Sequence, residues 1–373
     1  MKLIVFFLGW LSTVSLFAQQ GSSPALAGHS QPEQVVATYS IVAWDSVTGD
    51  LGVAVQSKFL GVGAVVPFAK AGVGAIATQA WANTMYGPQG LSMLESGQSA
   101  QEVVQALTIS DSNATRRQVG IVDAHGNSFA YTGSACQPWA GHVMGKWYSV
   151  QGNILAGEGV VKAMARMFEI TPGDLAERLL ASVEAGEAAG GDKRGRQSAA
   201  LLVVRDKGGY SGYNDRFVDI RVDDNLQPLV ELRRIYDLWT QTFLLDARFQ
   251  SIEQFNKNRN FSAASEEMKR VVAALNMQVR KKPDDPEVLN NVAWTMATHD
   301  IDLSQALELA KRAVKLAPEK LSFLDTMAEC HFRLGHYDEA IAIEAGLVTK
   351  DASNDEYWKQ LQKFKEAKTK AGK

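Results

Sequence analysis

The sequence has few of the residues that build disulfide frameworks, metal centres and nucleotide-binding loops. Its 373 residues include 2 cysteines, Cys136 and Cys330, which fall in what we expect to be different domains, so we predict two isolated thiols. It has no Cys/His spacing typical of zinc, no His-Glu-x-x-His helix, no Gly-rich phosphate loop followed by Lys-Ser/Thr and no Gly-x-Ser-x-Gly elbow. We therefore expect no metal ion, no cofactor and no ordinary α/β-hydrolase.

An excess of charge of one sign is also lacking. The chain has 38 Lys and Arg against 41 Asp and Glu, a formal net charge of −3. Its 46% hydrophobic and 21% charged content is ordinary for a globular protein that buries a core. This balance gives no electrostatic basis for binding nucleic acid or an anionic membrane surface. We therefore expect no nucleic-acid partner.

Long hydrophobic runs are missing except for one near the start. Residues 3–17 are almost wholly apolar, with Lys2 before them and Ala18 after them. A spanning helix needs about 20 apolar residues, so residues 1–18 predict a secretory signal peptide, with an uncleaved anchor as the alternative. Residues 19–37, rich in Ser, Gly, Pro and Gln, predict a disordered linker. We expect an exported protein, periplasmic or extracellular, with no stable membrane span after signal cleavage.

The next two hundred residues alternate β-rich runs, Gly turns and amphipathic segments. The β-rich runs are apolar on both faces, which indicates a layered fold. The expected strands are residues 38–45, 51–57, 62–67, 73–79, 117–123, 128–132, 147–151, 199–205 and 217–222. The expected helices are residues 88–96, 99–107, 158–168 and 172–188. Ser99 lies three residues before Glu102, the spacing of a capping box, and Thr171 is the expected N-cap of the last helix.

The remainder of the chain is poor in Gly and helical in pattern. Residues 229–257 predict one or two long helices that leave the first domain. Beyond them, residues 289–297 with 303–316 and residues 321–334 with 337–348 align at a period of about 34 residues, the value of tetratricopeptide repeats. We therefore predict a repeat domain that binds a protein partner on its concave face. A plain helical bundle is the alternative.

A set of unusual runs occurs in a fixed order. The runs are residues 38–45, 52–58, 72–80, 86–90, 117–120, 149–157 and 190–200. Together they resemble the bacterial domain-of-unknown-function family numbered 1028, which is placed among Ntn-hydrolase-like folds; the resemblance covers roughly residues 38–238. It implies a four-layer αββα sandwich, which we place at residues 38–240. Together with the all-α tetratricopeptide-like repeats at 241–373, which rest on the period of about 34 residues, this gives an α+β fold.

The resemblance also implies a nucleophile at the start of the first strand. In Ntn hydrolases this residue is Thr, Ser or Cys, and its freed α-amine serves as the base. Thr38 occupies that position but has 37 residues before it, so the chain must be cut after Ala37 for the amine to exist. The alternative is that Thr38 is a β-branched strand residue without a catalytic role. Lys58 is the expected electrostatic helper and Asn153 the expected oxyanion donor.

Further residues are expected to line the site. Ser40 is a second candidate nucleophile, and the Asp192–Arg194 pair either holds a loop or binds a carboxylate. The expected substrate-binding set is Ser40, Thr78, Gln79, Asn83, Gly152, Asp192, Arg194 and Gln197. The sequence thus predicts an amide hydrolase acting on a peptide, an acyl-amide or a cell-wall fragment. The alternative is a non-catalytic domain that binds a small molecule or peptide, with a protein-docking tail.

Overall fold

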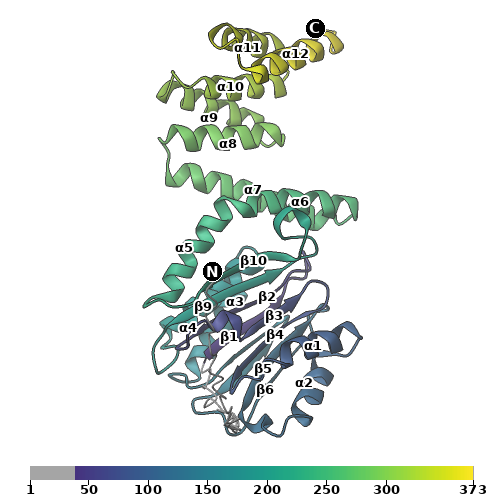
Figure 1. Ribbon diagram of the computed structural model, residues 1–373, viewed down its shortest axis with the longest axis vertical. Coiled ribbons are helices and arrows are strands. Elements are labelled where there is room, and N and C mark those ends of the chain that lie inside the picture. Colours follow the sequence, from purple (N-terminus) through teal and green to yellow (C-terminus); the bar gives the residue numbers. More distant parts are fainter. Residues whose placement is uncertain (1–37, 373) are drawn as a thin grey trace, which may run out of the picture. The chain divides into compact units, whose positions relative to one another are not determined.

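The computed structural model describes residues 38–372, shown in colour in Figure 1. The expected signal peptide and linker lie outside the described residues. Within the described part of the chain, no helix is long and apolar enough to cross a membrane. Cys136 and Cys330 are both free, as predicted. The division into domains is a prediction that the structure does not test further.

Six antiparallel strands form the larger sheet. Its order is β10-β9-β2-β1-β8-β7. The strands are β1 (Thr38–Trp44), β2 (Leu51–Ser57), β7 (Gly141–Gly145), β8 (Tyr148–Gly152), β9 (Ser198–Val204) and β10 (Arg216–Val222). The first strand lies between β2 and β8, and Thr38 at its head is paired with Ser57 at the end of β2. A central strand has backbone partners on both sides, which holds Thr38 in a fixed position.

A second sheet packs against the first. Its order is β3-β4-β5-β6, made of β3 (Pro67–Lys70), β4 (Gly74–Ala80), β5 (Arg117–Asp123) and β6 (Ser128–Thr132). Two helices, α1 (Tyr86–Glu95) and α2 (Ala100–Ile109), cover its outer face, and α3 (Gly159–Ile170) and α4 (Leu175–Ala188) cover the outer face of the larger sheet. The four layers are therefore αββα, as the family resemblance implies.

Alternation along β1 separates the two cores. Tyr39, Ile41 and Ala43 pack against α3 and α4, whereas Val42 packs between the sheets. Side chains of a strand point to opposite faces in turn, so Thr38 and Ser40 share the inter-sheet face with Val42. Apolar side chains fill one half of that inter-sheet space, and polar side chains fill the half nearest Thr38.

Several helix and strand boundaries differ from those expected. Residues 62–67 were expected as a strand, but Val62–Ala64 is a 3₁₀ turn and the strand begins at Pro67. The edge strand β7 has no counterpart in the sequence prediction. The predicted capping box at Ser99 is present in α2. The expected cap at Thr171 is wrong, because α4 begins at Leu175 and the Asp174 side chain caps it instead.

Helices make up the rest of the described chain. They are α5 (Pro228–Gln241), α6 (Phe243–Lys257), α7 (Phe261–Lys281), α8 (Pro286–Thr298), α9 (Leu303–Leu316), α10 (Leu321–Arg333), α11 (Tyr337–Lys350) and α12 (Asp355–Lys370). The pairs α8–α9 and α10–α11 correspond to the two predicted repeats. Each buries alanines at the matched positions, including Ala293 and Ala328 in the first helices and Ala306 and Ala340 in the second. Small residues there allow neighbouring helices to pack closely.

Candidate functional site

The candidate site lies at the head of β1, between the two sheets. Thr38 Oγ1 donates a hydrogen bond of 3.0 Å to Ser57 Oγ. Both residues are fully buried. The antiparallel register that pairs Thr38 with Ser57 places the two hydroxyls on the same face of the larger sheet. Sequence reasoning missed Ser57, although its place at the inward-facing end of β2 could have suggested it.

Two donors hold the backbone carbonyl of Thr38. The backbone N–H of Asn153 donates to this oxygen at 3.0 Å, and Gln79 Nε2 donates to it at 3.3 Å. Asn153 directly follows β8, whereas Gln79 belongs to β4 of the other sheet. The predicted residues Thr38, Asn153 and Gln79 are therefore brought together, and both sheets contribute to fixing the nucleophile candidate.

A buried amide connects these residues. Gln118 Oε1 accepts hydrogen bonds from Gln79 Nε2 at 2.8 Å and from Asn153 Nδ2 at 3.0 Å. Gln118 Nε2 in turn donates to the carbonyl of Gly152 at 2.8 Å. Burying an amide without partners is costly, so these mutual bonds are what allow a polar layer inside the sandwich. Among the described residues, the Oδ1 oxygen of Asn153 has no hydrogen-bond partner.

Ser40 belongs to the same polar layer. Its Oγ donates to Gln79 Oε1 at 2.6 Å and accepts from Gln151 Nε2 at 2.7 Å. Gln151 needs the space that a glycine leaves, because a Cβ added at Gly120 would lie 2.1 Å from Gln151 Oε1. Sequence reasoning missed Gln118 and Gln151. A polar side chain at an inward position of an apolar strand was the available signal.

The loop that contains Asp192 closes over the end of β2. Asp192 is nearly fully buried and accepts from the backbone N–H of Lys58 at 3.2 Å. The guanidinium of Arg194 binds the same carboxylate through two contacts, at 3.1 Å and 2.8 Å. The pair therefore holds the loop beside Ser57. The Lys58 side chain itself is exposed.

The remaining predicted residues lie at the margin or on another face. The backbone N–H of Gln197 donates to the carbonyl of Ser57 at 2.9 Å, but its side chain binds Asp224. Thr78 lies on the opposite face of β4, where its hydroxyl donates to the Asn83 carbonyl at 3.2 Å. Thr78 and Asn83 are thus not brought together with Thr38, and their role in binding stays a prediction.

Asn83 takes part in a separate ionic cluster. Its amide donates to Asp111, which also pairs with Arg117 at 2.8 Å. Burial alone would raise the pKa of Asp111, but the hydrogen bond from Arg117 and further donors lower it to about 2. This carboxylate is ionised at neutral pH and holds the loop between α2 and β5.

The chemistry available at the head of β1 is that of a hydroxyl. Over the residues that the structure describes, no group of three or more His, Cys, Asp or Glu side chains could hold a metal ion. The arrangement contains a threonine hydroxyl that donates to a second hydroxyl, a backbone carbonyl held by two donors, and several side-chain amide N–H groups. Such groups are suited to binding or attacking a carbonyl compound.

Comparison with known proteins identifies relatives of both parts of the chain. A family of unknown function (DUF1028) matches residues 38–232, and a tetratricopeptide repeat family matches residues 300–363. The crystal structure of a DUF1028 protein from Silicibacter pomeroyi is similar, with 31% identity and a TM-score of 0.52 over 56% of this chain and 92% of that chain. No match is found among curated proteins.

A second solved structure is more distant. The ancestral beta-subunit (Anbu) from Yersinia bercovieri shares 14% identity with the chain, over 53% of this chain and 93% of that chain. Its TM-score of 0.26 is too low to bear on the fold. The four-layer arrangement therefore rests on the sheets and helices described above.

Proposed function

Since this chain belongs to the family of unknown function DUF1028, we propose its activity from the geometry around Thr38. The proposed activity is that of an exported amide-bond hydrolase of the Ntn type, acting on a peptide, an acyl-amide or a cell-wall fragment. The observation that carries the proposal is the place of Thr38, at the head of a central strand with its hydroxyl 3.0 Å from Ser57. The family match begins at the same residue, which supports the proposal.

The mechanism requires a cut between Ala37 and Thr38. The cut frees an α-amine whose reference pKa is near 8, so that it can accept a proton at neutral pH. This amine takes the proton of Thr38 Oγ1 while the oxygen bonds to the substrate carbonyl carbon. The tetrahedral intermediate then expels the amine product, which leaves with that proton, and an ester on Thr38 remains. Water hydrolyses the ester and restores the hydroxyl.

Two neighbours have proposed roles in these steps. Asn153 donates the oxyanion hydrogen bond through Nδ2, which then moves from Gln118 Oε1 to the substrate. Lys58, directly after β2, supplies positive charge that favours the neutral form of the α-amine. Asp192 supports Lys58 by binding its backbone N–H.

The decisive experiment is intact-mass analysis of the mature protein from its native host. A chain that starts at Thr38 supports the proposal. A mature chain that keeps residues ahead of Thr38 contradicts it, because the α-nitrogen then stays an amide and cannot accept the proton. Thr38→Ser should preserve hydrolysis of a substrate found by screening, and Thr38→Ala should abolish it.

A second candidate function is a non-catalytic binding domain. It is favoured by one observation, which is that the Asn153 amide needed for the oxyanion already donates to Gln118 inside a mutually bonded layer. Such a layer can present polar groups to a small ligand without reacting. Ligand binding that Thr38→Ala leaves unchanged, with no hydrolysis by the wild type, would favour this function.

The repeat tail is the part of the chain suited to a protein partner. Tetratricopeptide repeats bind peptides and partner proteins on a concave surface. We propose that this tail places the sandwich next to its substrate or partner in the cell envelope. Cross-linking of the full chain in its host, compared with a chain ending at residue 284, which keeps α7 and its buried Glu267, tests this. A partner captured equally by both chains would contradict it.

A further inference from the structure

A cavity of about 460 Å³ lies away from Thr38, between the loop that joins β9 to β10 and the helices α5 and α6. The register of the larger sheet places it at the far end of β9: Ser198 is paired with Ser57, whereas Val204 at the other end is paired with Leu51. The cavity therefore does not belong to the candidate site. Its volume falls within the range of small-molecule pockets.

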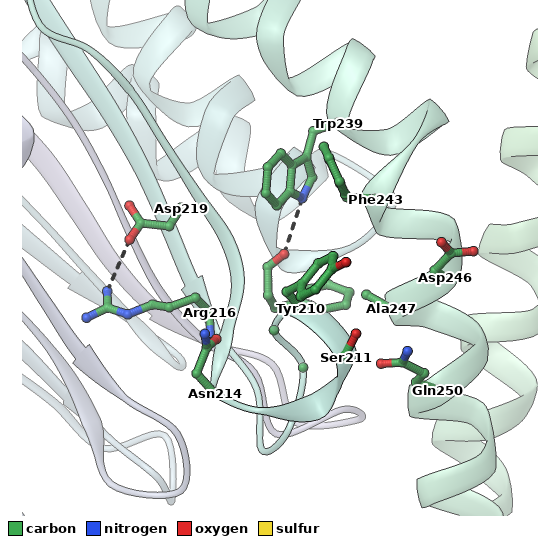
Figure 2. A pocket seen from close by; sticks show the side chains of 13 residues that line it. Tyr210, Ser211, Asn214, Arg216, Asp219, Trp239, Phe243, Asp246, Ala247 and Gln250 are labelled. Atoms are coloured by element: carbon green, nitrogen blue, oxygen red, sulfur yellow. Dashed lines mark hydrogen bonds and ion pairs between the residues drawn. The ribbon is translucent and has the colours of Figure 1, made fainter.

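Besides the buried Phe217 of β10, three aromatic rings line this cavity. They belong to Tyr210 in the loop, Trp239 at the end of α5 and Phe243 at the start of α6. Figure 2 shows Trp239 next to Phe243, with Tyr210 below them in the view; the first two ring centroids are 5.1 Å apart. Tyr210 is 75% exposed and Phe243 is 55% exposed. Aromatic rings that are this exposed to water beside a cavity indicate a binding surface.

The charge of the lining is negative. The positive charge of Arg216 is neutralised by two ion pairs, with Asp219 at 3.6 Å and with Asp215 at 3.8 Å. Asp246 of α6 also lines the cavity, and over the described part of the chain it forms no ion pair. One arginine against two aspartates among the lining residues leaves one net negative charge. This negative charge would repel an anionic ligand and attract a cationic ligand.

The walls of the cavity are held by specific contacts. Trp239 Nε1 donates to the carbonyl of Phe217 at 3.3 Å, which fixes the indole against β10. Asn214 Oδ1 accepts from the backbone N–H of Arg216 and occupies the place of a side chain at Gly209, where an added Cβ would lie 1.8 Å from it. A ligand entering this cavity therefore meets an aromatic wall and loop that are already positioned.

We propose that this cavity binds a small organic cation with a quaternary ammonium group. Such a group has no hydrogen-bond donors and is recognised by the negative faces of aromatic rings with a carboxylate nearby. Tyr210, Trp239 and Phe243 supply the rings, and Asp246 supplies the carboxylate. The cavity is separate from Thr38, so this proposal does not depend on whether the sandwich hydrolyses amides.

Calorimetric titration of the full chain with choline tests the proposal. The control ligand is 3,3-dimethylbutan-1-ol, which has the same shape and no charge. Choline should bind at least about tenfold more tightly than the alcohol, because the attraction depends on the charge. Phe243→Leu keeps an apolar side chain without a ring and should weaken choline binding by about threefold or more, as should Tyr210→Ala. Asp246→Asn should weaken it as well.

Tyr213 provides the matched control variant. It lies in the same loop and is 87% exposed, but it does not line the cavity. Tyr213→Ala should therefore leave choline binding unchanged. The proposal is overturned if choline does not bind, if the alcohol binds as tightly as choline, or if Tyr213→Ala weakens binding as much as Tyr210→Ala.

Discussion

Arg205, which directly follows β9, donates a hydrogen bond of 3.1 Å to Glu267 of α7. The same guanidinium binds both carboxylate oxygens of Asp50 at 2.6 Å. Glu267 also accepts hydrogen bonds of 2.6 Å from Arg248 and Arg270, and it is fully buried. Removing one charge from such a buried network is costly, so the network ties α6 and α7 to the sandwich.

Glu267→Gln should destabilise the chain strongly. The substitution leaves Arg205 and Arg248 buried with one negative charge fewer, and breaking a buried ion pair costs about 3–5 kcal/mol. Urea unfolding followed by circular dichroism measures the change. The control is Glu308→Gln in α9, which removes an exposed ion pair with Lys311 and should change stability by less than about 0.5 kcal/mol. Equal effects of the two substitutions would show that the buried network contributes nothing.

The Glu267 carboxylate should also make the stability of the chain depend on pH. Burial would raise the pKa of Glu267, but the charges of Arg205 and Arg248 lower it from 4.5 to about 2. A carboxylate whose pKa is lower in the folded chain stabilises the fold above pH 4.5, and this contribution is lost as the pH falls toward 2. Melting temperatures between pH 5 and pH 2 should therefore fall more steeply in the wild type than in Glu267→Gln. Parallel curves would contradict the assignment.

Glu344 of α11 should have the opposite pH dependence. It is fully buried, and burial together with the negative charge of Asp325 raises its pKa. A carboxyl group whose pKa is raised on folding leaves the chain most stable below the ordinary value of 4.5, and stability is lost as the pH rises. Glu344→Gln should therefore raise the melting temperature at pH 8 and change it little at pH 4. The exposed Glu339→Gln in the same helix should do neither, and a loss of stability at pH 8 in Glu344→Gln would refute the prediction.

Gly120→Ala should destabilise the sandwich because of one contact. Its added Cβ would lie 2.1 Å from Gln151 Oε1. The Gln151 side chain is buried and bonded to Ser149 and Ser40, so it cannot move away freely, and overpacking of this kind costs about 1–3 kcal/mol. The cost should shrink in a Gln151→Ala background, which a double-mutant cycle of unfolding free energies measures. Gly157→Ala is the control, since nothing lies within 4 Å of the added atom. If Gly120→Ala costs the same unfolding free energy in the Gln151→Ala background, the destabilisation does not come from contact with Gln151.

Local sequence signals were enough to predict a layered fold and the repeat helices, whereas the four-layer order followed from the family resemblance. Alternating apolar runs with Gly turns gave most strands, and Ser99 with Glu102 gave the start of α2. Residues 62–67 were misjudged because an apolar run alone does not separate a strand from a turn. There Gly63 packs against Ala200, where an added Cβ would lie 2.8 Å away. The edge strand β7 has two glycines and a histidine in five residues, which hides its pattern.

The site was only half predictable because its contacts are distant in the sequence. Thr38 and Asn153 followed from a resemblance and from their places beside strands. Gln118, which links Asn153 to Gln79, depends on the pairing of two sheets that no local pattern specifies. The Arg205–Asp50 pair spans 155 residues, and neither residue carries a local signal of its partner. Long-range pairing, rather than residue type, decided what was missed.

The last prediction concerns how the chain would be cut before Thr38. In the uncut chain the α-nitrogen is an amide, so the Ser57 hydroxyl, 3.0 Å from Thr38 Oγ1, is the group positioned to relay the Thr38 proton. The proton ends on the α-nitrogen as its bond to the Ala37 carbonyl breaks, and water then hydrolyses the ester formed on Thr38. If Thr38 attacks its own preceding carbonyl, Thr38→Ala should abolish the cut, and Thr38→Ser should retain it. Ser57→Ala should slow the cut by at least about tenfold. This is less than the roughly 100-fold or more that a positioned acid–base group contributes.

Intact-mass time courses of the purified precursor measure this cut. Ser40→Ala is the matched control, because Ser40 is buried in the same polar layer and is the second candidate nucleophile. It should leave the cut between Ala37 and Thr38 in place. A cut that survives Thr38→Ala would assign cleavage to another protease. A cut that Ser40→Ala slows as much as Thr38→Ala does, in a chain that still folds with the wild-type melting temperature, would contradict the assignment of the attack to Thr38 alone.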